Sequence, residues 1–156
     1  MGFRSTRARR GERGLTLVEL IVAITILLIL TGMAIPIARV RIKREKERQL
    51  RYALWEMREA IDRYKDAADR NAFRVKVGTD GYPPDLETLV DGVDVAGKKV
   101  RFLRRIPEDP MTGNTEWGLR SMQDDPKSQS WGGQSVFDVY SKSDGTAMDG
   151  TKYSDW

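Results

Sequence analysis

A single apolar run, residues 15–38, dominates the first quarter of this 156-residue chain. As a helix it would rise about 36 Å, enough to cross the ~30 Å hydrocarbon core of a membrane. A removable secretory signal peptide usually has a shorter apolar region, followed by a small-residue cleavage site that this run lacks. The run therefore predicts a transmembrane helix, and a plain signal anchor is the simplest alternative.

Glu19 is the one charged residue in this run. A carboxylate inside a membrane costs on the order of 2.5–3.5 kcal/mol, so we expect Glu19 to have a partner. Cleavage between Gly14 and Leu15 would create an α-amino group one helical turn away, which could pair with this carboxylate in the same chain or in a neighbouring one. The alternative is a Glu19 that lies among the lipid headgroups and stays hydrated.

Residues 1–14 form a basic leader with five arginines and one acidic residue, Glu12. The formal net charge of the whole chain is +4, and removal of the leader leaves 22 basic and 22 acidic side chains. The basic character therefore belongs to the leader, and we expect no nucleic-acid binding. Both flanks of the apolar run are basic, so charge alone does not predict its orientation in a membrane.

Cysteine and histidine are absent from the sequence. Their absence excludes disulfides, thiol nucleophiles, zinc sites built from Cys and His, and catalysis by a histidine base. No spacing of the remaining polar residues suggests another catalytic arrangement. We therefore expect a protein that is not an enzyme.

Helical periodicity continues beyond the apolar run. Apolar residues recur at steps of three and four from Leu50 to Ala68, which predicts an amphipathic helix over residues 39–76. Residues 77–156 begin with turn formers and then predict a short helix at 85–90 and strands at 115–122 and 136–141. The predicted fold is α+β: a long N-terminal helix, half transmembrane and half amphipathic, packed on a small antiparallel sheet.

Residues 14–19, Gly-Leu-Thr-Leu-Val-Glu, follow a basic leader and precede a long apolar helix. This arrangement resembles the class III signal of type IV pilins and type II secretion pseudopilins. The resemblance implies that a prepilin peptidase cuts after Gly14 and that Leu15, which replaces the more usual Phe, becomes N-methylated. It also implies that Glu19 acts in filament assembly.

The same resemblance extends along the helix and into the second half of the chain. Pro36 matches the family's helix-breaking proline, and Gly32 lies where the helix is expected to loosen on assembly. Residues 82–84 (Tyr-Pro-Pro), 106–110 and 137–141 are similar to segments of the major pseudopilin, the G subunit of type II secretion. The fold implied is the type IV pilin-like fold.

The function implied by this resemblance is that of a structural subunit of a periplasmic pseudopilus, which drives type II protein secretion. Such a subunit crosses the inner membrane once, with its leader in the cytoplasm and its C-terminal domain in the periplasm, and is extracted into a homopolymeric filament. The implied partners are other copies of the chain, the prepilin peptidase, minor pseudopilins and the inner-membrane assembly platform. Two alternatives stay open: a pilin of a surface or DNA-uptake pilus, and a membrane-tethered domain of unknown activity.

The C-terminal segment is rich in Asp, Gly and Ser, which supply the oxygen ligands and turns that calcium sites use. Major pseudopilins bind calcium in the corresponding loop, and their Asp-Gly pair matches Asp144 and its neighbouring glycine. The resemblance thus implies a calcium site to which Ser141, Asp149 and Asp155 add ligands. The alternative is a surface turn without a metal.

Overall fold

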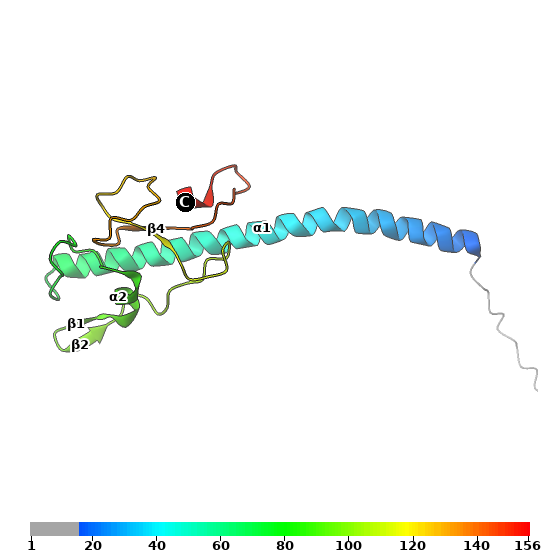
Figure 1. Ribbon diagram of the computed structural model, residues 1–156. Helices are drawn as coiled ribbons and strands as arrows, with labels where there is room; N and C mark the ends of the chain where they lie inside the picture. The colour runs from blue at the N-terminus through cyan, green and yellow to red at the C-terminus, as the bar shows by residue number, and fades with distance from the viewer. Residues whose placement is uncertain (1–15) are drawn as a thin grey trace, which may run out of the picture. The chain divides into compact units, whose positions relative to one another are not determined.

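The computed structural model describes residues 16–156, apart from the side chains of residues 33–37. The chain divides into two compact units, Met1–Val40 and Arg41–Trp156. Helix α1 (Leu17–Asp69), of 53 residues, contributes to both (Figure 1). The predicted α+β class is confirmed, because all of the strands belong to the second unit, where they accompany the second part of α1.

In the second unit, α1 presents one apolar stripe to the rest of the fold. The predicted stripe is confirmed, since its members are buried: Leu50, Ala53, Leu54, Met57, Ala60, Ile61, Tyr64 and Ala68. Steps of three and four residues return to the same face because an α-helix has 3.6 residues per turn. One face of α1 is therefore covered along about five turns.

Helix α1 ends at Asp69, sooner than the predicted end at residue 76. Asn71 adopts the left-handed conformation, with φ of 53°. The amide of Asn71 donates to the carbonyl of Ala68 at 2.9 Å, and the amide of Ala72 donates to the carbonyl of Ala67 at 3.0 Å. These two bonds satisfy the last carbonyls of the helix and turn the chain away from its axis.

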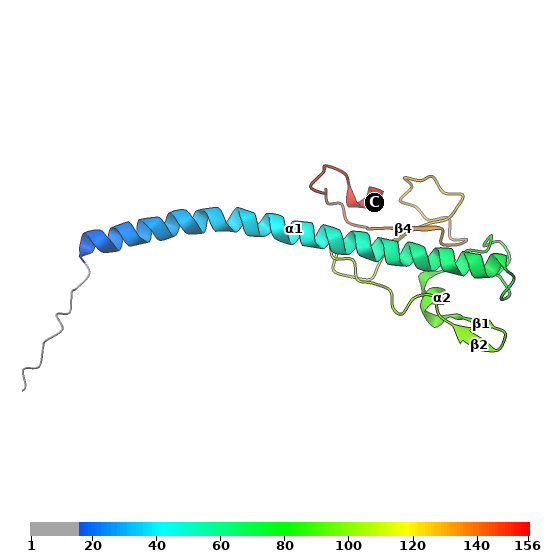
Figure 2. The same ribbon diagram turned by 180° about the vertical axis from the view of Figure 1, so that it is seen from behind.

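The strands are short and form two separate pairs rather than the one small sheet that the sequence predicted. Strand β1 (Val93–Val95) pairs antiparallel with β2 (Lys98–Val100), and β3 (Gly118–Arg120) pairs antiparallel with β4 (Asp138–Tyr140). Strands β3 and β4 lie within the two predicted strand segments, whereas the sequence did not predict β1 and β2. In Figures 1 and 2, α2 (Leu86–Asp91) and the β1–β2 hairpin lie on one side of α1, and β4 and the C-terminal segment on the other.

The β1–β2 hairpin depends on a two-residue turn with positive φ at both positions, 51° at Ala96 and 81° at Gly97. This backbone twist matches the twist of two paired strands. The Asp94 carboxylate stabilises the turn, because it accepts a hydrogen bond from the amide of Gly97 at 2.8 Å. Alanine tolerates this conformation less well than Asn or Gly, which is why the sequence signal for the hairpin was weak.

The core lies between the buried stripe of α1 and the side chains of α2, the strands and the loops that cover this stripe. Its further buried members are Leu86, Leu89, Leu103, Trp117, Val136, Val139, Ala147 and Tyr153. The Trp117 indole N–H is satisfied inside this core, since it donates to the carbonyl of Pro107 at 2.9 Å. Gly118 is needed beside it, because a Cβ at this position would overlap the ring of Tyr140.

We predict that Ile61→Ala lowers the free energy of unfolding by about 2–5 kcal/mol, because it removes buried methyl groups and leaves a cavity under α1. Ile61 is fully buried, whereas Gln49 on the same helix is exposed. Gln49→Ala is therefore the matched control and should change stability by less than about 0.5 kcal/mol. Denaturation of the detergent-solubilised chain, followed by circular dichroism, measures both; equal stability of the two variants would contradict the packing described.

Candidate functional site

The start of α1 is capped by a residue of the N-terminal sequence motif. The Thr16 hydroxyl oxygen accepts a hydrogen bond from the amide of Glu19 at 3.2 Å. Thr16 and Glu19 have the spacing of a capping box, and an acidic side chain in the first turn is favourable at the positive end of the helix. Glu19 therefore has a local role in helix initiation besides the predicted role in assembly. Gly14 and Leu15 lie outside the described residues.

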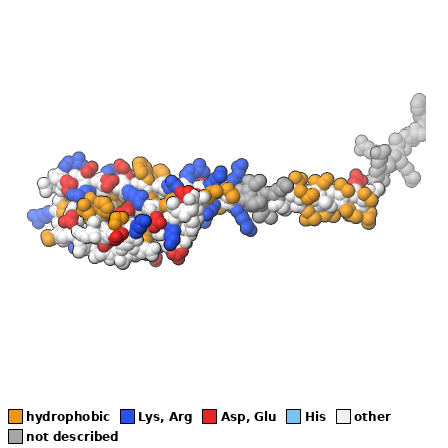
Figure 3. Space-filling model, turned by 90° about the horizontal axis from the view of Figure 1, so that it is seen from above, with side chains coloured by type: hydrophobic (Ala, Val, Ile, Leu, Met, Phe, Trp, Pro, Cys, Tyr) orange, Lys and Arg blue, Asp and Glu red, His pale blue; other side chains and the backbone are white. Residues whose placement is uncertain are grey.

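The first part of α1 exposes its apolar side chains on every face. Over residues 17–32 every side chain is exposed, and that of Leu17 is 74% accessible. Figure 3 shows hydrophobic side chains covering this stretch. The hydroxyls of its two threonines are satisfied within the helix, because the hydroxyl of Thr25 donates to the carbonyl of Ile21 and that of Thr31 to the carbonyl of Leu27. Such a surface needs a lipid or protein environment.

Gly32 and Pro36 both lie within α1. A Cβ at Gly32 would meet no atom within 4 Å, so no packing contact in the described residues requires glycine there. Across the part of the chain that the structure describes, no helix is both long enough and apolar enough to cross a membrane. The span at residues 15–38, and the loosening at Gly32, stay predictions.

The four predicted calcium ligands do not form one cluster. Across the described chain, no three acidic side chains gather as a metal site would need. The Ser141 hydroxyl is buried and donates to the carboxylate of Asp109 at 2.6 Å. Asp144 and Asp155 are exposed. The described side chains thus lend no support to a calcium site, and calcium binding stays a prediction.

Asp149 is occupied by contacts within the protein. Its Oδ1 accepts hydrogen bonds from the amide and hydroxyl of Thr151 at 2.9 and 2.6 Å, and its Oδ2 lies 3.6 Å from the guanidinium of Arg51. The Thr151 hydroxyl and amide hold the pKa of Asp149 below its ordinary value, so this carboxylate is charged at neutral pH. Asp149 thus stabilises the turn at residues 149–151 and connects it to Arg51 of α1.

Direct contacts attach the C-terminal segment to α1. The Lys43 ammonium donates to the carbonyl of Thr146 at 2.7 Å. One oxygen of Glu47 accepts from the amide of Met148 at 2.9 Å and from the hydroxyl of Tyr153 at 3.0 Å. The α1 residues involved are spaced by four, so they share one face of the helix and form a row beneath residues 146–153.

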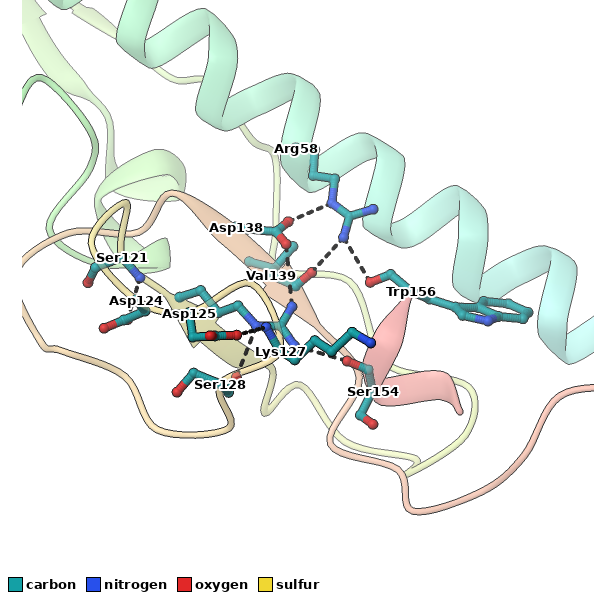
Figure 4. A network of polar contacts seen from close by, with 11 residues as sticks. Arg58, Ser121, Asp124, Asp125, Lys127, Ser128, Asp138, Val139, Ser154 and Trp156 are labelled. Carbon is teal, nitrogen blue, oxygen red and sulfur yellow. Dashed lines mark hydrogen bonds and ion pairs between the residues drawn. The ribbon is translucent and has the colours of Figure 1, made fainter. Parts of the chain in front are cut away.

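Two arginines and one carboxylate continue this attachment (Figure 4). Arg58 of α1 pairs with Asp138 of β4 at 2.7 Å, and its guanidinium also donates to the carbonyls of Val139 and Trp156. Arg120 of β3 is buried and donates to the carbonyl of Ser154 at 3.1 Å, with its guanidinium 3.5 Å from Asp138. Asp138 therefore joins α1, both strands and the C-terminal segment.

Sequence reasoning did not find this network. Arg58 and its partner Asp138 are 80 residues apart in the sequence, so no local pattern connects them. The available signal was the strand alternation, which places Arg120 on the same face as buried Gly118. A long cationic side chain on the inward face of a strand implies a buried partner.

We predict that Asp138→Asn lowers stability by about 1–3 kcal/mol, because it leaves the buried Arg120 and the half-buried Arg58 without a charged partner. Asp149→Asn is the matched control, since it also removes a carboxylate beside an arginine, but on an exposed pair, and should have a much smaller effect. Thermal unfolding of both variants measures this, and a larger loss for Asp149→Asn would contradict the role given to Asp138.

We predict that the shifted pKa of Tyr153 makes the stability of the protein fall at alkaline pH. Burial, and then its hydrogen bond to Glu47, raise the pKa of Tyr153 to about 12. The unfolded chain loses this proton near pH 10, so stability should be constant below pH 10 and fall between about pH 10 and 12. The fall should be smaller in Tyr153→Phe, which has no proton to lose. Unfolding at a series of pH values measures it, and identical pH profiles for the two proteins would refute the assignment.

Comparison with known proteins gives one match. Residues 9–35 match the family model of the prokaryotic N-terminal methylation motif. No curated protein and no solved structure matches the chain. The matched segment contains Gly14, Leu15, Glu19 and Gly32, whereas Pro36 lies just beyond it. The match supports a pilin-like N-terminal signal, of the kind that a prepilin peptidase processes and that becomes N-methylated in a structural type of subunit.

Proposed function

We propose that this chain is a structural subunit of a periplasmic pseudopilus that drives type II protein secretion. The observation that carries the proposal is the N-terminal methylation motif at residues 9–35, which overlaps the first part of α1, where the apolar side chains of residues 17–32 are exposed on every face. In this proposal the leader is removed after Gly14, Leu15 becomes the methylated N-terminus, and the protein polymerises through the first part of α1.

Two environments can remove the exposed apolar surface of residues 17–32 from water. Before assembly, the inner membrane covers it, with the leader in the cytoplasm and the folded unit in the periplasm. After extraction, the same surface is covered by the helices of neighbouring subunits. The transfer is favourable only if the polar groups of the helix remain satisfied, and the hydroxyls of Thr25 and Thr31 already are.

Glu19 restricts the transfer from membrane to filament to subunits that have been cleaved. A carboxylate in an apolar helix bundle needs a cation, and the α-amino group created at Leu15 is the nearest one that the sequence offers. A subunit that is not cleaved lacks this amine. Pairing of Glu19 with a new N-terminus, in its own chain or a neighbour, therefore couples processing to assembly.

The secretion branch is supported by two features of the folded unit. The segments that resemble the major pseudopilin lie together, because the ring of Tyr82 packs edge-on against that of Phe137 at 5.3 Å and the carbonyl of Pro83 accepts from the amide of Val136 at 2.8 Å. In addition, the sequence has no cysteine for the C-terminal disulfide that adhesive pilins often carry, and contacts with α1 hold its C-terminal segment. The partners proposed are the prepilin peptidase, minor pseudopilins and the inner-membrane assembly platform.

We predict that Glu19→Gln abolishes filament formation while membrane insertion and cleavage after Gly14 continue, because the variant keeps the shape of the side chain and removes only its charge. Thr25→Val is the control and should assemble normally, since its hydroxyl bonds only to its own helix. N-terminal sequencing and recovery of sheared filaments measure the two steps. Normal filaments from Glu19→Gln would contradict the pairing of the Glu19 carboxylate with the new α-amino group.

A deletion strain separates secretion from a surface pilus. We expect loss of this protein to leave secreted enzymes trapped in the periplasm, with surface pili unaffected. Complementation with the full chain should restore secretion, whereas a chain with Gly14→Val, which blocks cleavage, should not. Loss of surface filaments or of DNA uptake, with secretion intact, would instead assign the protein to a pilus.

A further inference from the structure

The face of α1 opposite the buried stripe is exposed and strongly charged. Within the second unit it carries basic residues first and acidic residues later: Arg41, Arg44 and Arg48, then Glu59, Asp62 and Asp66, all of them exposed. At 3.6 residues per turn these six positions lie on one face, about half a turn from the buried stripe. Figure 3 shows Lys and Arg side chains gathered around α1 at one end of the second unit.

Within the part of the chain that the structure describes, most of these charges have no partner. Among the described residues, the side chains of Arg41, Arg44, Glu59, Asp62 and Asp66 make no ion pair, whereas Arg48 pairs with Glu45 on the same helix. The outer face of α1 therefore carries unpaired positive charges near residues 41–44 and unpaired negative charges near residues 59–66.

The basic and acidic residues follow one another at a fixed spacing of 18 positions, which is about five helical turns. Residues related by this spacing therefore lie at the same angle around the helix. On the outer face, the pairs related by this spacing all have opposite charges: Arg41 with Glu59, Arg44 with Asp62, and Arg48 with Asp66.

We propose that this outer face of α1 binds the same face of a second copy of the chain, parallel to it and displaced by about five turns, or ~27 Å. The basic residues of one copy then lie level with the acidic residues of the next. Since the basic residues of that second copy remain free, the contact is head-to-tail and continues to a third copy. The inference rests on the proposed function, because it describes how neighbouring subunits of the filament meet.

Two aromatic side chains between the charged groups support a protein partner. Tyr52 and Trp55 lie on the same outer face, with 64% and 59% of their surfaces exposed and ring centroids 6.1 Å apart. Exposed tryptophan and tyrosine are enriched at protein interfaces, where their large apolar surface becomes covered. A second helix along this face would cover both rings and pair the charges that flank them.

An antiparallel contact centred on Trp55 also matches opposite charges, but with different partners: Arg41 would meet Asp69, and Arg51 would meet Glu59. Such a contact is isologous and closes after two copies. Two chains whose N-terminal segments enter the same membrane from the same side cannot adopt it. The parallel arrangement is therefore the one that suits a filament.

Paired cysteines distinguish the two arrangements, and the chain has no cysteine of its own to interfere. In the full chain, oxidised within the assembled fraction, Arg41→Cys with Glu59→Cys should give a ladder of covalent multimers. The matched pair, Arg41→Cys with Asp69→Cys, should give no ladder. A covalent dimer from the matched pair, with no ladder from the first, would overturn the parallel register.

Charge reversal tests whether the contact stabilises assembly. The triple variants Arg41→Glu/Arg44→Glu/Arg48→Glu and Glu59→Arg/Asp62→Arg/Asp66→Arg should each lower the yield of assembled protein by about ten-fold, because like charges then face each other. Expression of both variants together should restore the yield, since each variant then again meets opposite charge. Unchanged melting temperatures of the folded unit would show that both variants fold.

The remaining outcomes are decisive. Loss of assembly in the arginine variant alone, with weaker binding to vesicles of anionic lipid and no rescue by the second variant, would assign the basic residues to the membrane surface and overturn this inference. Normal filaments from both variants would overturn it too and leave the proposed function intact. A wild-type chain that keeps its leader and forms no filament would overturn the proposed function itself.

Discussion

Burial of a single stripe of α1 is the interaction on which the whole folded unit depends. The four strands have three residues each, so their backbone pairing adds little stability of its own. Side chains such as Leu89, Trp117 and Val139 are buried because α1 supplies the opposite wall of the core. Everything after Asp69 therefore folds as a covering for the helix, and cannot be expected to keep its shape without it.

The C-terminal part of this covering is attached by polar contacts rather than by apolar packing alone. Glu47 of α1 bonds to Met148 and Tyr153, and Arg58 bonds to Trp156 and to Asp138 of β4, which connects Arg58 with the buried Arg120. Charged hydrogen bonds of this kind fix one register between a helix and a segment without regular structure. In a chain that lacks cysteine, they perform the positioning that a disulfide performs elsewhere.

The extent to which the sequence predicted this structure follows from the kind of signal available. The buried stripe from Leu50 to Ala68 could be predicted because helical periodicity reports burial directly. The end of α1 and the β1–β2 hairpin could not, since they depend on positive φ at Asn71 and Ala96, residue types that do not demand that conformation. The division into two strand pairs was missed because strands of three residues show almost no alternation.

The candidate sites divide in the same way. The motif around Glu19 is local, so a run of residues suffices to recognise it, and the match to the methylation motif covers the same residues. The calcium site in the acidic C-terminal segment was predicted mainly from the resemblance, and it stays a prediction because a sequence reports ligand types but not where they point. In the structure Asp149 contacts its neighbour Thr151 and the distant Arg51, and Ser141 contacts the distant Asp109.

If subunits are stored in a membrane before assembly, as proposed above, the shortness of the strands has a consequence for them. A sheet edge of three residues offers another chain too few free amides and carbonyls for stable lateral strand addition. Subunits stored side by side at high local concentration are thereby protected from sticking together through their sheets. In the contact proposed above, association depends instead on α1, whose outer-face charges select the partner and the register.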